Sequence, residues 1–67
     1  MKELKEFVCL DGTPTDVELS EGLHQAKTNK CIVRISWKAF GSPYCIDIFE
    51  SDTLADCKDK LPKMYVL

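Results

Sequence analysis

Two apolar runs on either side of a short break restrict the fold of this chain more than any other feature of its sequence. Residues 30–40 read KCIVRISWKAF, and every second residue from Cys31 to Trp37 is apolar. This period of two is typical of a half-buried strand. Residues 44–50, YCIDIFE, resume the pattern after Gly-Ser-Pro, and a Gly-Ser pair suits a tight turn in which the glycine takes a positive φ. The sequence therefore predicts a β-hairpin.

Two short helices are predicted by nearly the same phrase used twice, SEGLHQAKTN at residues 20–29 and SDTLADCKDK at residues 51–60. Ser20 and Ser51 are expected to cap the two helix N-termini, because a serine hydroxyl satisfies free backbone N–H groups there. Shared rules of capping and amphipathic packing explain the repetition better than an internal duplication does. The repeat thus predicts two helices that each cover part of a sheet.

The second helix carries an apolar stripe, because Leu54, Cys57 and Leu61 recur at helical spacing. Lysines in its last turn and the following Pro62 are signals that end a helix. We expect the stripe to pack on the apolar face of the hairpin, which comprises Val33, Ile35, Ile46 and Ile48.

The segment before the first helix allows two interpretations. Residues 6–10, EFVCL, predict a strand, and residues 16–19, DVEL, predict another because their two apolar residues alternate with acids. Alternatively, Thr15 and Glu18 have the spacing of a capping box, which would begin one longer helix over residues 15–28. We favour the short strand and leave the longer helix open.

Together these elements predict a single α+β domain over residues 1–67, in the order β-β-α-β-β-α-β. The expected architecture has two layers: an antiparallel sheet of four or five strands with one or two short helices on one face. The final apolar run, Met64–Leu67, either completes the sheet or offers an edge for a homodimer.

The four cysteines, at positions 9, 31, 45 and 57, are scattered singly among apolar residues. We expect reduced, mostly buried thiols without a bound metal, because zinc sites usually have paired ligand spacing and His24 is the only histidine. The sequence contains possible nucleophiles and a histidine, but not in a recognisable catalytic arrangement. It contains no phosphate-binding loop motif. We therefore expect no catalytic residues, no cofactor and no enzymatic activity.

The opening stretch MKELKEF lacks an apolar leader segment, and no run approaches the length of a membrane span. These features predict a cytoplasmic location without membrane contact. A reducing compartment also suits four unpaired thiols.

A basic band is the strongest functional signal in the sequence. Residues 22–46 contain no acid but four basic residues, Lys27, Lys30, Arg34 and Lys38. Although this band is also compatible with an ordinary solvated sheet face, its mixture of apolar and positive residues is suited to gripping a partner. We expect the partner-binding residues to lie on the outward face of the hairpin and at its turn: Lys30, Ile32, Arg34, Lys38, Phe40 and Tyr44.

The phrase IDIFESDTLADCKDKL, residues 46–61, is a strand followed by a capped helix with the pattern T-L-x-x-[AC]. It resembles the strand–helix step of small accessory proteins of bacteriophages and mobile elements, such as inhibitors of host RNA polymerase and anti-CRISPR proteins. The resemblance implies stoichiometric binding to a larger host protein and inhibition of that enzyme or defence complex.

Two other functions remain open. A small nucleic-acid-associated regulator would use the basic band, although the net charge of −2 and the absence of interleaved aromatics make this the weaker alternative. A structural subunit is the third possibility.

Overall fold

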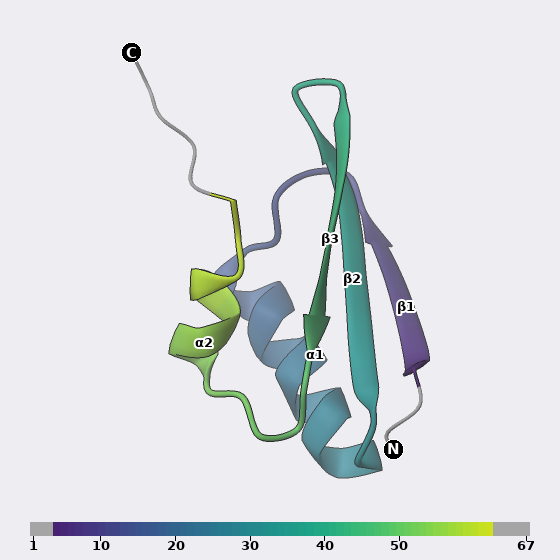
Figure 1. Cartoon of the computed structure of the whole chain (residues 1–67), viewed down its shortest axis with the longest axis vertical. Helices are drawn as coiled ribbons and strands as arrows, with labels where there is room; N and C mark the ends of the chain where they lie inside the picture. Colours follow the sequence, from purple (N-terminus) through teal and green to yellow (C-terminus); the bar gives the residue numbers. More distant parts are fainter. Residues whose placement is uncertain (1–3, 63–67) are drawn as a thin grey trace.

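The computed structural model describes residues 4–62 and contains five elements. Their order is β1 (Leu4–Leu10), α1 (Asp16–Asn29), β2 (Ile32–Ala39), β3 (Ser42–Ile48) and α2 (Leu54–Asp59) (Figure 1). The predicted α+β class is confirmed. Neither helix in this part of the chain is long and apolar enough to cross a membrane.

The three described strands form one mixed sheet in the order β1-β2-β3. β2 and β3 form the predicted antiparallel hairpin, but β1 pairs with β2 in parallel, so the prediction of an antiparallel sheet is wrong for β1. A helix of 14 residues extends about 21 Å, which returns the chain to the end of the sheet where β1 began. The predicted last strand, Met64–Leu67, lies outside the described residues.

α1 begins at a capping box, which settles the choice left open for residues 16–19. The Thr15 hydroxyl accepts a hydrogen bond from the Glu18 N–H at 3.3 Å, and the Glu18 carboxylate accepts one from the Thr15 N–H at 2.9 Å. Two backbone N–H groups that a helix start leaves unpaired are thereby satisfied. The favoured strand at residues 16–19 is therefore wrong, and Ser20 lies inside the helix rather than at its cap.

The hairpin turn consists of Phe40 and Gly41, because Ala39 pairs with Ser42. Both turn residues have positive φ, 52° at Phe40 and 77° at Gly41, as the two central residues of a type I′ turn require. The predicted Gly-Ser turn is thus displaced by one residue. The glycine supplies the second left-handed position, and a bulky aromatic occupies the first.

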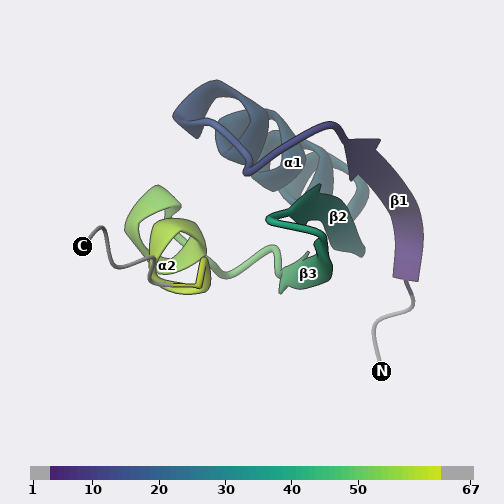
Figure 2. The same ribbon diagram turned by 90° about the horizontal axis from the view of Figure 1, so that it is seen from above.

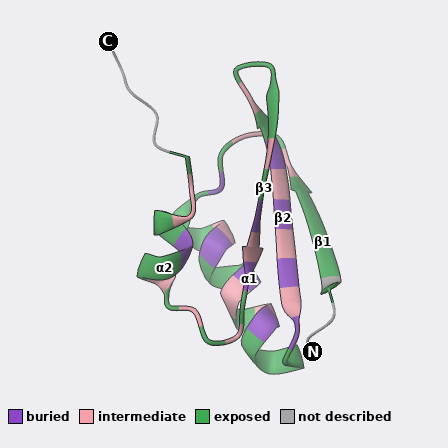
Figure 3. Cartoon of the chain, viewed as in Figure 1, coloured by how far each residue is buried: buried purple, intermediate pink, exposed green. Residues whose placement is uncertain are grey.

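The core lies between α1 and one face of the sheet. Figure 2 shows α1 over that face and α2 beside the β3 edge, with no described element over the opposite face. Figure 3 shows that buried residues concentrate where α1 meets the sheet, whereas β1 is largely exposed. The buried hydrophobic residues come from α1, β2, β3, α2 and the residue before β2: Leu19, Ala26, Cys31, Val33, Ile35, Trp37, Ile46, Ile48 and Cys57.

Gly22 allows α1 to approach the sheet closely. A Cβ atom added at this buried glycine would lie 3.1 Å from the Cδ1 atoms of both Ile35 and Ile48. Glycine inside a helix costs about 1 kcal/mol relative to alanine, so the close approach explains a residue that appears unfavourable from sequence alone.

α2 also starts with a capping box, formed by Thr53 and Asp56 rather than by the predicted Ser51. Its predicted stripe faces the core as expected: Cys57 is fully buried, and the half-buried Leu54 and Leu61 pack against the core cluster. The helix lies mainly against α1 rather than over the sheet face.

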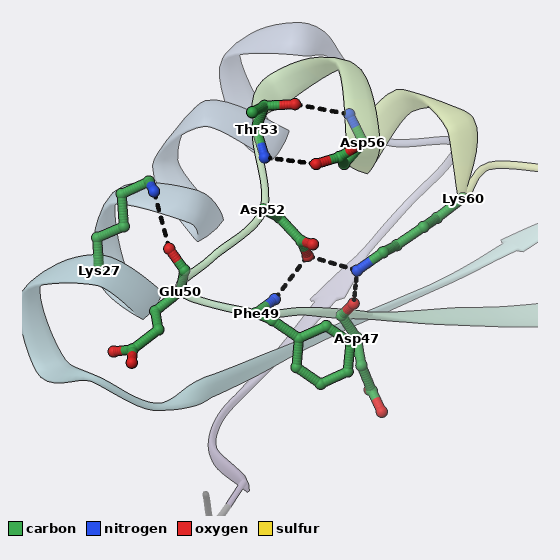
Figure 4. A network of polar contacts seen from close by, with 8 residues as sticks. All are labelled: Lys27, Asp47, Phe49, Glu50, Asp52, Thr53, Asp56 and Lys60. Atoms are coloured by element: carbon green, nitrogen blue, oxygen red, sulfur yellow. Dashed lines mark hydrogen bonds and ion pairs between the residues drawn. The ribbon is translucent and has the colours of Figure 1, made fainter.

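A polar network ties the end of α2 to the end of β3 (Figure 4). The Lys60 ammonium donates hydrogen bonds to the Asp47 carbonyl oxygen at 2.6 Å and to the Asp52 carboxylate. The same carboxylate accepts the Phe49 N–H at 2.8 Å, and the ammonium lies 4.4 Å from the centre of the Phe49 ring. Burial alone would raise the pKa of Asp52, but the bonds from Lys60 and Phe49 outweigh it and lower that pKa.

We expect Gly22→Leu to destabilise the fold by about 3 kcal/mol or more, because the new side chain must displace two packed isoleucines. Urea unfolding followed by circular dichroism measures this. Ser20→Leu, at an exposed position of the same helix, is the matched control and should change the free energy of unfolding by less than about 0.5 kcal/mol. Equal effects would show that α1 does not sit on the sheet at Gly22.

We expect Lys60→Met to lower the free energy of unfolding by about 1–3 kcal/mol, because it leaves the largely buried Asp52 carboxylate without its cation. Lys58→Met is the control. Lys58 contacts Asp16 at 3.4 Å in an exposed pair, which should contribute under about 1 kcal/mol.

The difference in free energy of unfolding between wild type and Lys60→Met should depend on pH. Ionised Asp52, whose pKa is lowered in the folded protein, stabilises the fold above its unfolded pKa of about 3.9. This contribution is lost as the pH falls through the lower folded value. The stability difference between wild type and Lys60→Met should therefore shrink below about pH 4. A constant difference from neutral pH to pH 2 would contradict the role assigned to the ion pair.

Candidate functional site

The sheet face opposite α1 presents the even-numbered residues of β2 and their neighbours on both flanking strands. Arg34 lies between Phe7 of β1 and Asp47 of β3, and Ser36 lies between Cys9 and Cys45. No described element covers this face (Figure 2). It is therefore an uncovered surface built from all three described strands.

An ion pair occupies the centre of this face. Arg34 donates two hydrogen bonds to the Asp47 carboxylate, from Nε at 2.7 Å and from an Nη atom at 3.1 Å. The hydrogen bonds from Arg34 lower the pKa of Asp47, and the same contact raises the pKa of Arg34. The two-point geometry fixes the orientation of the guanidinium group relative to the Asp47 carboxylate.

Large apolar side chains surround the ion pair. Phe7 is 59% exposed next to Arg34 in the sheet, and Leu4 is 44% exposed opposite the half-buried Ile32. Phe49 follows β3 directly and is 41% exposed despite its contact with Lys60. We call the five residues Leu4, Phe7, Ile32, Arg34 and Phe49 the open-face patch.

The basic band does not form a set of free cations. Lys27 on α1 donates to the Glu50 carbonyl oxygen at 2.8 Å, and Arg34 is held by Asp47. Lys30 ends α1 in a left-handed conformation and also takes part in an interaction. Lys38 is exposed on β2. The structure thus distributes the four predicted basic residues over a helix, a helix end and a strand.

Two predicted aromatic anchors lie apart from Arg34. Tyr44 is on the α1 side of the sheet, where its ring stacks on Trp37 with centroids 5.6 Å apart and planes 18° from parallel. Phe40 occupies the hairpin turn and is 87% exposed. Six residues along β2 separate Phe40 from Arg34, or about 20 Å. The predicted single surface is therefore divided, with Ile32 and Arg34 in the patch and Phe40 at the turn.

A shallow apolar hollow lies near the turn, where β1 ends and the hairpin continues. Its volume is about 280 Å³, and it is lined by the end of β1 and by both hairpin strands: Cys9, Leu10, Ser36, Trp37, Lys38, Pro43 and Tyr44. The lining residues alternate between the two faces of the sheet, and the ring of Trp37, which is only 4% exposed, lies on the α1 side.

The sequence interpretation missed Leu4, Phe7 and Phe49. Alternation in EFVCL already places Phe7 and Cys9 on one face of a strand. Alternation alone reveals neither the parallel pairing of β1 with β2 nor the irregularity between Leu4 and Glu6. Because this irregularity adds one residue to β1, Leu4 and Phe7 lie opposite Ile32 and Arg34, on the same face.

The cysteines divide into two classes. Cys31 and Cys57 are buried, whereas Cys9 and Cys45 are exposed, so the prediction of mostly buried thiols is only half right. Burial raises the pKa of Cys57. The described residues contain no group of three or more His, Cys, Asp or Glu side chains placed to hold a metal ion.

Comparisons of this chain with protein-family profiles, with curated proteins and with solved structures found no match.

We expect two thiols to react rapidly with an Ellman-type reagent in the native protein, and the other two only when the chain unfolds, because burial shields a thiol from the reagent. Mass spectrometry after alkylation should assign the fast pair to Cys9 and Cys45. Cys9→Ser is the matched variant and should remove one fast equivalent. Four equal rates in the native state would contradict the burial of Cys31 and Cys57.

Proposed function

We propose that this chain is a non-catalytic protein-binding module whose contact surface is the open-face patch. The observation that carries the proposal is the concentration of Leu4, Phe7 and Phe49 around the Arg34–Asp47 pair on an uncovered sheet face. Clustered exposed apolar side chains mark interaction sites, and aromatic and arginine residues contribute most of the energy at protein interfaces.

The ion pair supports binding to a protein rather than to a highly charged ligand. Asp47 neutralises Arg34, so the centre of the patch has little net charge while its border is apolar. Arg34 is already oriented by two hydrogen bonds, which reduces the side-chain entropy lost when a partner covers it.

A nucleic-acid-associated role is less well supported. A phosphate approaching Arg34 must compete with Asp47 at 2.7 Å, and Lys27 is engaged with a backbone carbonyl. The two exposed aromatics of the open-face patch, Phe7 and Phe49, accompany a neutralised arginine, whereas grooves for single-stranded nucleic acid combine aromatics with free positive charge.

The partner we propose is a larger host protein, bound stoichiometrically in the cytoplasm and inhibited when its working surface is covered. The resemblance of residues 46–61 to phage accessory proteins supports this choice of partner. Within the described residues, no cluster suited to metal-dependent catalysis competes with this proposal.

Affinity capture with quantitative mass spectrometry tests the proposal, using three forms of the protein. Wild type and Val17→Ala should capture the same partner, because Val17 is 78% exposed on α1 and lies outside the patch. Phe7→Ala with Phe49→Ala should weaken binding by about 30-fold or more, as the loss of interface anchors does.

Circular dichroism and thermal unfolding must show that the double variant is folded. Capture of the same partner at wild-type affinity by the folded double variant would overturn the assignment of the patch. A steep, log-linear loss of affinity with salt, removed by nuclease treatment, would instead identify a nucleic-acid ligand.

A further inference from the structure

The two edges of the sheet differ in their protection against pairing with another strand. β3 contains Pro43, which has no N–H group, and α2 lies beside this edge (Figure 2). The Lys60 ammonium also donates to the Asp47 carbonyl oxygen at 2.6 Å. Proline and a covering element are devices that prevent strand addition at an edge. In the described chain β1 has neither device, because its sequence LKEFVCL lacks proline and no element lies along its outer edge.

Pro43 also reveals how the backbone of β2 is oriented. Pairs in an antiparallel ladder alternate between hydrogen-bonded and non-hydrogen-bonded, and a pair that contains proline belongs to the second kind. Lys38 lies opposite Pro43 and therefore directs its N–H and C=O away from β3. The alternation gives Ser36 and Arg34 the same direction. The backbone groups of these three residues consequently face β1.

The outward backbone groups of β1 belong to Phe7 and Cys9. In a parallel ladder, a residue bonds to the two neighbours of its partner rather than to the partner itself. Arg34 and Ser36 lie opposite Phe7 and Cys9, so they bond to the residues on either side of these two, which include Val8. The N–H and C=O of Phe7 and Cys9 therefore point away from β2, toward an edge that no other described strand occupies.

β1 also exposes apolar side chains on both of its faces. Phe7 is 59% exposed on the open face, and Val8 is 36% exposed on the α1 side, opposite Ile35. Apolar residues on both faces are typical of a parallel strand that is covered on both sides. The irregularity in β1 precedes residues 6–10, which pair with β2 without interruption. This run has the length of an ordinary strand, so it can hold a further strand at its free edge.

We propose that the protein partner of this chain contributes an extended segment that pairs with residues 6–10 as a further strand of the sheet. The backbone of the segment bonds to the outward groups of Phe7 and Cys9, and its side chains cover Phe7 and Val8. Glu6 is exposed at the start of this run, which favours a basic residue of the segment beside it.

This inference rests on the proposed function and specifies how the partner is recognised. Phe7 belongs to the open-face patch and also carries an outward N–H, so a partner that covers the patch reaches this edge as well. The patch then supplies side-chain contacts, while the edge supplies a set of hydrogen bonds that only another peptide backbone can match in spacing.

Residue-resolved hydrogen exchange provides the first test. In the free protein, the amides of Phe7 and Cys9 should exchange about 100-fold faster than the amide of Val8, which bonds to β2. Binding of the partner captured by wild type should slow Phe7 and Cys9 by about tenfold or more. Slow exchange of both amides in the free protein would overturn the proposal, because a second copy or another part of the chain would already occupy the edge. Unchanged exchange in the complex would overturn it too.

N-methylation of the Phe7 nitrogen, introduced by chemical synthesis of the chain, tests the hydrogen bonds separately from the ring. This variant keeps the Phe7 side chain but loses its outward N–H. It should fold as wild type does and bind the partner about tenfold or more weakly. N-methylation of Asp16, at the first position of α1 where a missing N–H is tolerated, should change neither property. N-methylation of Val8 should lower the unfolding temperature, because its N–H bonds to β2.

The outcomes separate this inference from the proposed function. Wild-type affinity of the folded Phe7 N-methyl variant would overturn the strand pairing, and weak binding by Phe7→Ala with Phe49→Ala would then still support the patch. A Phe7 N-methyl variant that does not fold would show that this N–H bonds to β2, which also overturns the proposal. If wild type captures no protein, both proposals fail.

Discussion

The close contact between α1 and the sheet at Gly22 determines most of the remaining structure. A Cβ atom there would meet Ile35 and Ile48 at 3.1 Å, so the helix lies nearer to β2 and β3 than any larger residue would allow. This places Leu19 and Ala26 in the core with zero exposure. The helix packs mainly on β2 and β3, and β1 contributes strand pairing, an exposed surface and the half-buried Leu10, which packs against the core.

Among the described elements only α1 is long enough to cover a sheet face, and the opposite face stays open within the described residues. α2 does not cover that face. Its six residues lie beside β3, held by Cys57 in the core and by the contacts of Lys60 with Asp52 and with the Asp47 carbonyl. Asp47 thus serves two elements: its carbonyl anchors α2, and its carboxylate orients Arg34. One residue is thus a contact point for both α2 and the open face.

The open face and the hairpin turn offer two surfaces with different physical character. The open-face patch is broad and is centred on a neutralised charge, which suits a contact with another protein surface. The turn is narrow, with one strained aromatic beside an apolar hollow. Phe40 lies about 20 Å from Arg34 along β2, whereas the hollow reaches Cys9 and Ser36, which belong to the open face.

The sequence by itself determined the α+β class, the hairpin and the core face of α2, because these follow from local periodicity and capping chemistry. It also contained the capping box of α1, although Val17 and Leu19 alternate as in a strand and favoured the wrong alternative. Only the tertiary structure decided that β1 runs parallel to β2 and that Leu4 and Phe7 lie beside Ile32 and Arg34. The tertiary structure also places Tyr44 on the opposite sheet face from Arg34, and Phe40 in the distant hairpin turn. Strand partners and irregularities in register depend on contacts between distant residues, and these contacts leave no periodic signal in a single sequence.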